Sequence, residues 1–278
     1  MVQSTPMMEQ YNSIKSRHKD ALLFFRMGDF YELFNDDAKV ASKVLGITLT
    51  SRSKSENAIP MAGVPHHAAD GYISRLIQGG YKVAICDQIQ DPREAKGIVA
   101  RDVTRVITPG TVTEDILLKE KNNNYLAAIL VKDDKAGLSW VDLSTGRFDA
   151  EDINVKQLID ELSRINPSEC LLQESWERNR SAALNGFFDE ISAMVSTRPD
   201  WEFGCDTGYK TLTEHFGTSS LSGFDCDDLE LSIGAAGALI QYLKETQKAS
   251  LNHIRKITKF SCGEFLSMDR ATQYSLEL

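Results

Sequence analysis

Residues 21–34, ALLFFRMGDFYELF, contain two apolar runs that favour β-strands and meet at Gly28-Asp29. Glycine at the first position of a two-residue turn suits a tight β-hairpin. The period of two along a strand then places Phe30 and Glu32 on one face and Tyr31 on the other. The stretch predicts a hairpin that presents an aromatic ring beside a carboxylate. The F-x-E tripeptide alone is weak support for a site, because such a ring more often packs in a core.

The rest of the first part predicts a mixed sheet with helices on it. Asn35 or Asp36 can cap a helix that continues to Gly46, and Gly79-Gly80 ends a second helix. Residues 51–65 lack periodicity and carry two prolines, which is typical of a loop. The expected elements are helix 38–45, strand 47–50, loop 51–65, helix 68–78, and strands 82–88 and 103–108.

The polar run after Pro109-Gly110 breaks every period and marks a linker. Strands 125–132, 137–142 and 147–150 then form a β-meander, and helices and strands alternate after it. That order favours an RNase H-like layer fold, so the fold class is α/β. The expected elements there are helix 155–164, strand 169–172, a helix after Trp176, strand 191–197 and helix 227–249.

The expected domains are 1–108, a linker at 109–124, 125–250, and the start of a further domain at 251–278. Because the sequence stops at Leu278 without a closing element, we expect a truncated chain. Residues 1–108 hold 14 Lys or Arg against 12 Asp or Glu, a formal charge of +2, whereas the remainder carries −11. Any contact with a polyanion is therefore expected in the first part.

No apolar run is long enough to span a bilayer, and the first ten residues lack a signal pattern, so a cytoplasmic location is the default. The five cysteines are scattered without a C-x-x-C pair. An odd number of scattered cysteines argues against a disulfide framework. We expect buried, reduced thiols.

The string LLFFRMGDFYELFNDDA, together with IPMAGVPHHA, VAICDQIQDP and TRVITPGT, resembles the N-terminal domain of the MutS family of DNA mismatch-recognition ATPases. The resemblance continues through WVDLSTGRF, LNHIRKI and SMDRAT, so it covers nearly the whole chain. It implies a mismatch-binding domain, an RNase H-like connector and the first residues of the core. By the same resemblance, Phe30 wedges into DNA from the minor groove beside a mispaired base, and Glu32 hydrogen-bonds that base.

Affinity would come from phosphate contacts, for which Arg52, Lys54, Arg101 and Arg105 are candidates. Arg52 is preferred, because the family has a basic residue in that loop. Met61 is a candidate for packing against bases in the minor groove, or else a core methionine under a loop. The expected DNA-binding set is Phe30, Glu32, Arg52, Met61 and Arg105.

We expect no catalytic residue, metal or cofactor in this chain; ATP and Mg²⁺ belong to the intact family protein. The family also implies a homodimer and a MutL-type partner at the connector, and no membrane. His66-His67 lacks the further ligands of a zinc set. Gly234-Ala235-Ala236-Gly237 lacks the rest of a phosphate loop and favours close helix packing.

Two other functions remain open. A two-metal nuclease could use Asp142, Asp149 and Asp152 of the second part, although no later strand supplies an obvious partner set. A protein-binding scaffold would depend on the acidic second part and on exposed sheet edges, and it can coexist with DNA binding.

Overall fold

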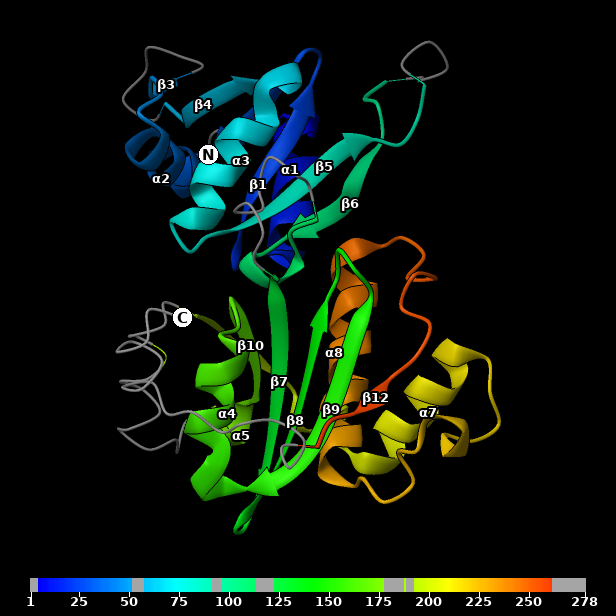
Figure 1. Cartoon of the computed structure of the whole chain (residues 1–278). Helices are drawn as coiled ribbons and strands as arrows, with labels where there is room; N and C mark the ends of the chain where they lie inside the picture. Colours follow the sequence, from blue (N-terminus) through cyan, green and yellow to red (C-terminus); the bar gives the residue numbers. More distant parts are fainter. Residues whose placement is uncertain are drawn as a thin grey trace. The chain divides into compact units, whose positions relative to one another are not determined.

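The computed structural model describes residues 5–51, 58–91, 97–113, 123–177, 188 and 193–261 (Figure 1). The chain divides into two compact units. Unit 1 consists mainly of the residues up to Pro109, and unit 2 mainly of the residues between Lys121 and Glu245. Each unit has its own sheet. The structure therefore confirms a mixed α/β chain.

Unit 1 is a six-stranded sheet in the order β3-β4-β2-β1-β5-β6, in which β1 and β5 are parallel and the other neighbours antiparallel. Its elements are α1 Pro6–Arg17, β1 Ala21–Met27, β2 Phe30–Phe34, α2 Asn35–Leu45, β3 Thr50–Ser51, β4 Pro60–Pro65, η1 His66–Ala68, α3 Ala69–Gln78, β5 Lys82–Gln88 and β6 Arg101–Ile107.

Helices pack on both faces of the unit 1 sheet. Alternate residues of its strands point to opposite sides, so each face has its own set of side chains. On one face, Phe25 and Phe34 form a buried cluster with Met8, Tyr11 and other residues of α1. Helices α2 and α3 cover the other face (Figure 1). Helix α1 was not predicted. Thr5 caps it, with a side chain that accepts a hydrogen bond from the Met8 backbone N–H.

Three expectations for unit 1 were wrong. Residues 60–65 were expected in a loop but form β4, which pairs with β2 on one side and β3 on the other. Of the expected strand 47–50, only Thr50 is strand, and it forms β3 together with Ser51. No side-chain cap begins α2: the residue before it is Phe34, and Asn35 is already its first residue. Gly46 ends α2 in the left-handed conformation, as expected.

Unit 2 is a six-stranded sheet in the order β11-β10-β7-β8-β9-β12. The first three strands form the expected antiparallel meander, and β10 pairs in parallel with β7 and β11. The elements are η2 Pro109–Thr111, β7 Tyr125–Lys132, β8 Lys135–Asp142, β9 Arg147–Asn154, η3 Val155–Gln157, α4 Leu158–Ile165, β10 Glu169–Gln173, α5 Glu174–Glu177, β11 Met194–Arg198, η4 Asp200–Phe203, α7 Cys205–Phe216, η5 Ser222–Phe224, α8 Leu231–Gln247 and β12 Thr258–Lys259.

The two faces of the unit 2 sheet have separate cores. Helix α4 packs on the face that carries Trp140, and α8 packs on the face that carries Phe148, so the layer arrangement expected from the element order is confirmed (Figure 1). Helix α7 was not predicted. The helix expected after Trp176 falls almost entirely outside the described residues, and the described helix there, α5, ends at Glu177.

Small residues bring α7 and α8 together, as the Gly234–Gly237 stretch predicts. A Cβ atom at Gly237 would lie 2.2 Å from the Cα of Gly208, and one at Gly234 would lie 2.3 Å from the carbonyl oxygen of Phe203. The stretch is thus a helix contact.

Candidate nucleic-acid interface

The hairpin turn has the predicted geometry. Met27 pairs with Phe30 across a two-residue turn, and Gly28 has a φ of 59°, a conformation that glycine adopts without steric cost. The carbonyl oxygen of Asp29 accepts a hydrogen bond of 2.8 Å from the backbone N–H of His66, just after β4. The turn is therefore held from a neighbouring strand as well as from its own hairpin.

Burial along one face of β2 increases away from the turn. Phe30 is 44% exposed, Glu32 is half-buried, and Phe34 is buried with its ring centroid 4.9 Å from that of Tyr11 in α1. The period of two puts these three side chains on the same face. Helix α1 covers the end of this face at Phe34, and the ring of Phe30 remains accessible to a ligand.

The opposite face of β2 anchors the strand. The hydroxyl of Tyr31 donates a 2.8 Å hydrogen bond to Asp87 of β5, and the Arg26 guanidinium lies 5.5 Å from the Tyr31 ring centroid. Asp87 also accepts a 2.9 Å bond from the Thr104 hydroxyl. Burial, followed by the bond to Asp87, raises the pKa of Tyr31. Tyr31 therefore links β2 to β5, two strands away.

Strand β4 extends the Phe30–Glu32 face. Its direct partners for Phe30, Glu32 and Phe34 are Pro65, Gly63 and Met61, respectively. Direct partners in an antiparallel pair share a face, so Met61 lies on the same side as Phe30 and Glu32. We call the side chains of Phe30, Glu32 and Met61 the probe face.

Met61 is half-buried and packs against the core cluster under α1. The core accounts for the buried part of this side chain, and a contact of Met61 with bases stays a prediction. Gly63 was not predicted to matter, and no local signal could reveal it, because its place opposite Glu32 depends on β4 being a strand.

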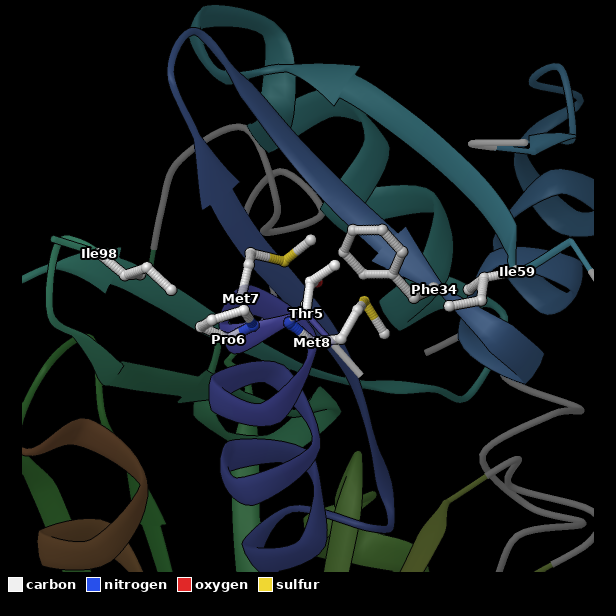
Figure 2. Close-up of a pocket in the computed structure, with 7 residues that line it drawn as sticks. All are labelled: Thr5, Pro6, Met7, Met8, Phe34, Ile59 and Ile98. Atoms are coloured by element: carbon white, nitrogen blue, oxygen red, sulfur yellow. Dashed lines mark hydrogen bonds between the residues drawn. The ribbon is translucent and has the colours of Figure 1, made fainter. Parts of the chain in front are cut away.

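An apolar pocket lies at the α1 end of this face, with a volume of about 350 Å³. Figure 2 shows the Phe34 ring next to Met7 and Met8, with Ile59 and Ile98 at opposite ends. Its lining is Thr5, Pro6, Met7, Met8, Phe34, Ile59 and Ile98. It carries no charged side chain, so it offers no partner for a phosphate.

The candidate phosphate-binding arginines differ in their surroundings. Arg101 is committed inside unit 1: its Nε donates to the Arg26 carbonyl oxygen at 2.6 Å, and its Nη1 donates to Gln10 Oε1 at 3.1 Å. Burial lowers its pKa. Arg105 is half-buried on β6, opposite Ile85. Arg52 and Lys54 lie outside the described residues.

The acidic residues considered for a nuclease site each have a structural role. Asp152 accepts hydrogen bonds from the backbone N–H groups of Glu230, Leu231 and Ser232, where α8 begins. Asp142 Oδ1 accepts from the Ser144 side chain at 2.6 Å, and the Arg147 Nε donates to Asp149 at 2.7 Å. Within the described ranges, no group of three His, Cys, Asp or Glu residues is arranged to hold a metal ion.

The structure describes four of the five cysteines and both adjacent histidines. Cys86, Cys170 and Cys226 are buried free thiols, Cys205 is a half-buried one, and Cys262 lies outside the described residues. His66 and His67 form the short helix η1. Among the helices that the structure describes, none has the length and apolar character to cross a membrane.

The two sheets and the ring–carboxylate pair at the hairpin define a two-domain α/β protein with its most prominent candidate site in the first domain. The profile of MutS domain I matches residues 5–116, and that of MutS domain II matches residues 124–255. The chain belongs to the MutS family, of which it carries domains I and II.

Two curated relatives, both named DNA mismatch repair protein MutS, agree with this assignment. The protein of Halothermothrix orenii is 47% identical over 287 residues, which cover 100% of this chain and 31% of the relative. The protein of Symbiobacterium thermophilum is 47% identical over 281 residues, which cover 99% of this chain and 32% of the relative. The chain thus spans about a third of the length of these relatives.

Proposed function

We propose that this chain recognises mispaired or unpaired bases in duplex DNA, and that Phe30 is the side chain that enters the base stack from the minor groove. The observation that carries the proposal is the Phe30 ring, 44% exposed at a hairpin turn beside a carboxylate on the same face. The relatives named as mismatch repair proteins support the kind of ligand.

The physical basis of this recognition is the deformability of the base step. An inserted apolar side chain must unstack a base step, at about a few kcal/mol, and that cost is smallest where the pair is already mismatched. Stacking on an aromatic ring returns about 1–3 kcal/mol. A difference of this size between mismatched and matched DNA corresponds to about one or two decades in affinity.

Glu32 adds chemical selectivity to the insertion of Phe30. Its carboxylate is repelled by phosphates. It forms a favourable hydrogen bond only where a base N–H donor faces it. Overall affinity must come from cations, for which we propose Arg52 and Arg105, with Met61 packing along the groove. Arg101 is not proposed, because its guanidinium is committed to internal acceptors.

We further propose that the chain binds rather than catalyses, and that it acts in the cytoplasm within a longer, homodimeric protein that uses ATP and Mg²⁺. The Gly234–Gly237 stretch does not fit a phosphate loop, since Gly234 and Gly237 contact helix and backbone neighbours. Unit 2 is proposed to contact a MutL-type partner; its exposed Trp201 (65%) and Tyr209 (39%) support a protein-binding surface. We propose domain limits of 1–108, 125–250 and 251–278.

The test compares duplexes with a G·T pair, with one unpaired base and with neither, using fluorescence anisotropy at fixed salt. Phe30→Ala is expected to lower the preference for the defective duplexes by about tenfold or more, on the order of one lost stacking contact. Trp201→Ala removes an exposed aromatic ring from unit 2 and is the matched control, expected to leave the preference unchanged. Equal binding of all three duplexes by the parent chain, or an unchanged preference in Phe30→Ala, would overturn the proposal.

A further inference from the structure

Gly63 lies directly opposite Glu32 in the β2–β4 pair. A Cβ atom built on Gly63 would lie 2.6 Å from Glu32 Oε2, 3.0 Å from Cδ and 3.1 Å from Oε1. All three nearest heavy atoms thus belong to one carboxylate. The Glu32 carboxylate occupies the volume that any other side chain at position 63 would fill.

The other neighbours of Glu32 on its own face of the sheet are aromatic residues. Its partner on β1 is Phe25, which is fully buried and covered by the Arg101 guanidinium at 5.0 Å from the ring centroid. Along β2, the same face carries the rings of Phe30 and Phe34. By register, aromatic residues therefore lie on three sides of Glu32 in the sheet, and its carboxylate lies over Gly63 of β4.

The backbone does not itself require glycine at position 63. Gly63 is not among the glycines with positive φ, so an L-residue fits its conformation without strain. Glycine inside a strand costs stability, and it often marks a place where another group approaches closely. Here the approaching group is the Glu32 carboxylate.

We propose that Gly63 is a positioning residue for base recognition: its missing side chain fixes where the Glu32 carboxylate lies, and so which base N–H groups that carboxylate can reach. The inference rests on the proposed function of the probe face. Hydrogen bonds weaken steeply with distance and angle, so a carboxylate displaced by a methyl group loses much of its bond to a base donor.

Gly63→Ala isolates this effect, because the displaced atoms are the far end of a flexible side chain. The fold can accept the methyl group by moving the Glu32 carboxylate, so the stability of unit 1 is expected to change little. The control is Gly71→Ala in α3, where a Cβ atom meets nothing within 4 Å. Both variants make the same chemical change in unit 1.

The first measurement needs no DNA. The ¹³C chemical shift of the Glu32 carboxyl carbon, assigned through Glu32→Gln, is expected to change in Gly63→Ala and to stay constant in Gly71→Ala. An unchanged shift in Gly63→Ala would show that Gly63 does not hold the carboxylate, and would overturn the inference whether or not the chain recognises mismatches.

The second measurement is a double-mutant cycle on mismatched and matched duplexes. Gly63→Ala is expected to lower mismatch preference by about threefold to tenfold, on the order of one weakened hydrogen bond to a charged group. In the Glu32→Ala background, the same change is expected to have no further effect.

An equal loss in both backgrounds would show that Gly63 acts independently of Glu32, and no loss in either would show that carboxylate position is irrelevant; each result overturns the inference. A parent chain without mismatch preference would overturn the proposed function, and with it the recognition role of Gly63. The chemical shift would still decide whether the Gly63–Glu32 contact exists, so the two failures are distinguishable.

Discussion

Gly237→Ala should destabilise unit 2, because α8 and α7 touch there through backbone. The new Cβ would lie 2.2 Å from the Gly208 Cα, 3.2 Å from its carbonyl carbon and 3.3 Å from its nitrogen. Carbon atoms in contact prefer about 3.5–4.0 Å, so one helix must move by more than about 1 Å. Overpacking costs about 1–3 kcal/mol, and the better helix propensity of alanine returns about 1 kcal/mol. We expect a net loss of up to about 2 kcal/mol.

The chain offers a selective assay for this loss. Its three tryptophans are Trp140, Trp176 and Trp201, all in unit 2, so urea unfolding followed by tryptophan fluorescence reports on that unit. Gly223→Ala is the matched control, because a Cβ there meets nothing within 4 Å. Its free energy of unfolding should stay within about 0.5 kcal/mol of that of the parent. A Gly237→Ala midpoint equal to or above that of the parent would refute the close backbone contact.

Three further changes test the network around the site and the acids of unit 2. Tyr31→Phe should cost unit 1 about 1 kcal/mol in urea unfolding followed by circular dichroism, because it removes only the bond to Asp87; unchanged stability would contradict the anchor. Asp152→Ala should cost unit 2 about 1–2 kcal/mol and Asp152→Asn less, since the carboxylate accepts the N–H groups that begin α8. Mg²⁺-dependent DNA cleavage lost without loss of stability would instead favour the nuclease. Burial, and then the Glu161 carboxylate, raises the pKa of Glu151 from 4.5 to about 8. The folded chain therefore binds more protons there between these values, so stability falls as pH rises through the window. Glu151→Gln should flatten that fall and stabilise unit 2 by about 1 kcal/mol at pH 8; an unchanged slope between pH 5 and 8 would contradict it.

Local patterns were sufficient to predict the hairpin and several strands. The glycine of the turn and the alternation after it are properties of neighbouring residues, and β5 and β7 have the bounds that their local sequence predicts. The alternation places Phe30 and Glu32 on one face, but it does not decide whether Phe30 is exposed, since Phe34 on the same face is buried.

Strand β4 could not be predicted in this way. Pro60, Pro65 and Gly63 are typical of a loop when read alone, but the prolines stand at the two ends of β4 and the strand is defined by its pairing on both sides. That pairing is long-range. The place of Gly63 beneath Glu32 follows from register, which the sequence of residues 51–65 does not encode by itself.

The arginines illustrate a second limit. Sequence shows how many cations the first domain has, but whether a guanidinium is available depends on its acceptors. The acceptors of Arg101 include the Arg26 carbonyl oxygen and Gln10, which are 75 and 91 residues away in sequence. An exposed loop position and a committed internal position therefore look alike until the fold is known.

The two faces of β2 bear on the proposed insertion of Phe30 into the base stack. A side chain that enters a base stack discriminates only if its own strand does not yield, because a yielding strand would let it fit matched and mismatched steps alike. Here the Asp29 carbonyl is held by His66, and the Tyr31 hydroxyl is held by Asp87. The ordering cost of Phe30 is thus met during folding rather than on binding. If Phe30 acts as proposed, loosening the anchor at Tyr31 should reduce discrimination between duplexes more than it reduces overall affinity, which we propose to depend on phosphate contacts elsewhere in unit 1.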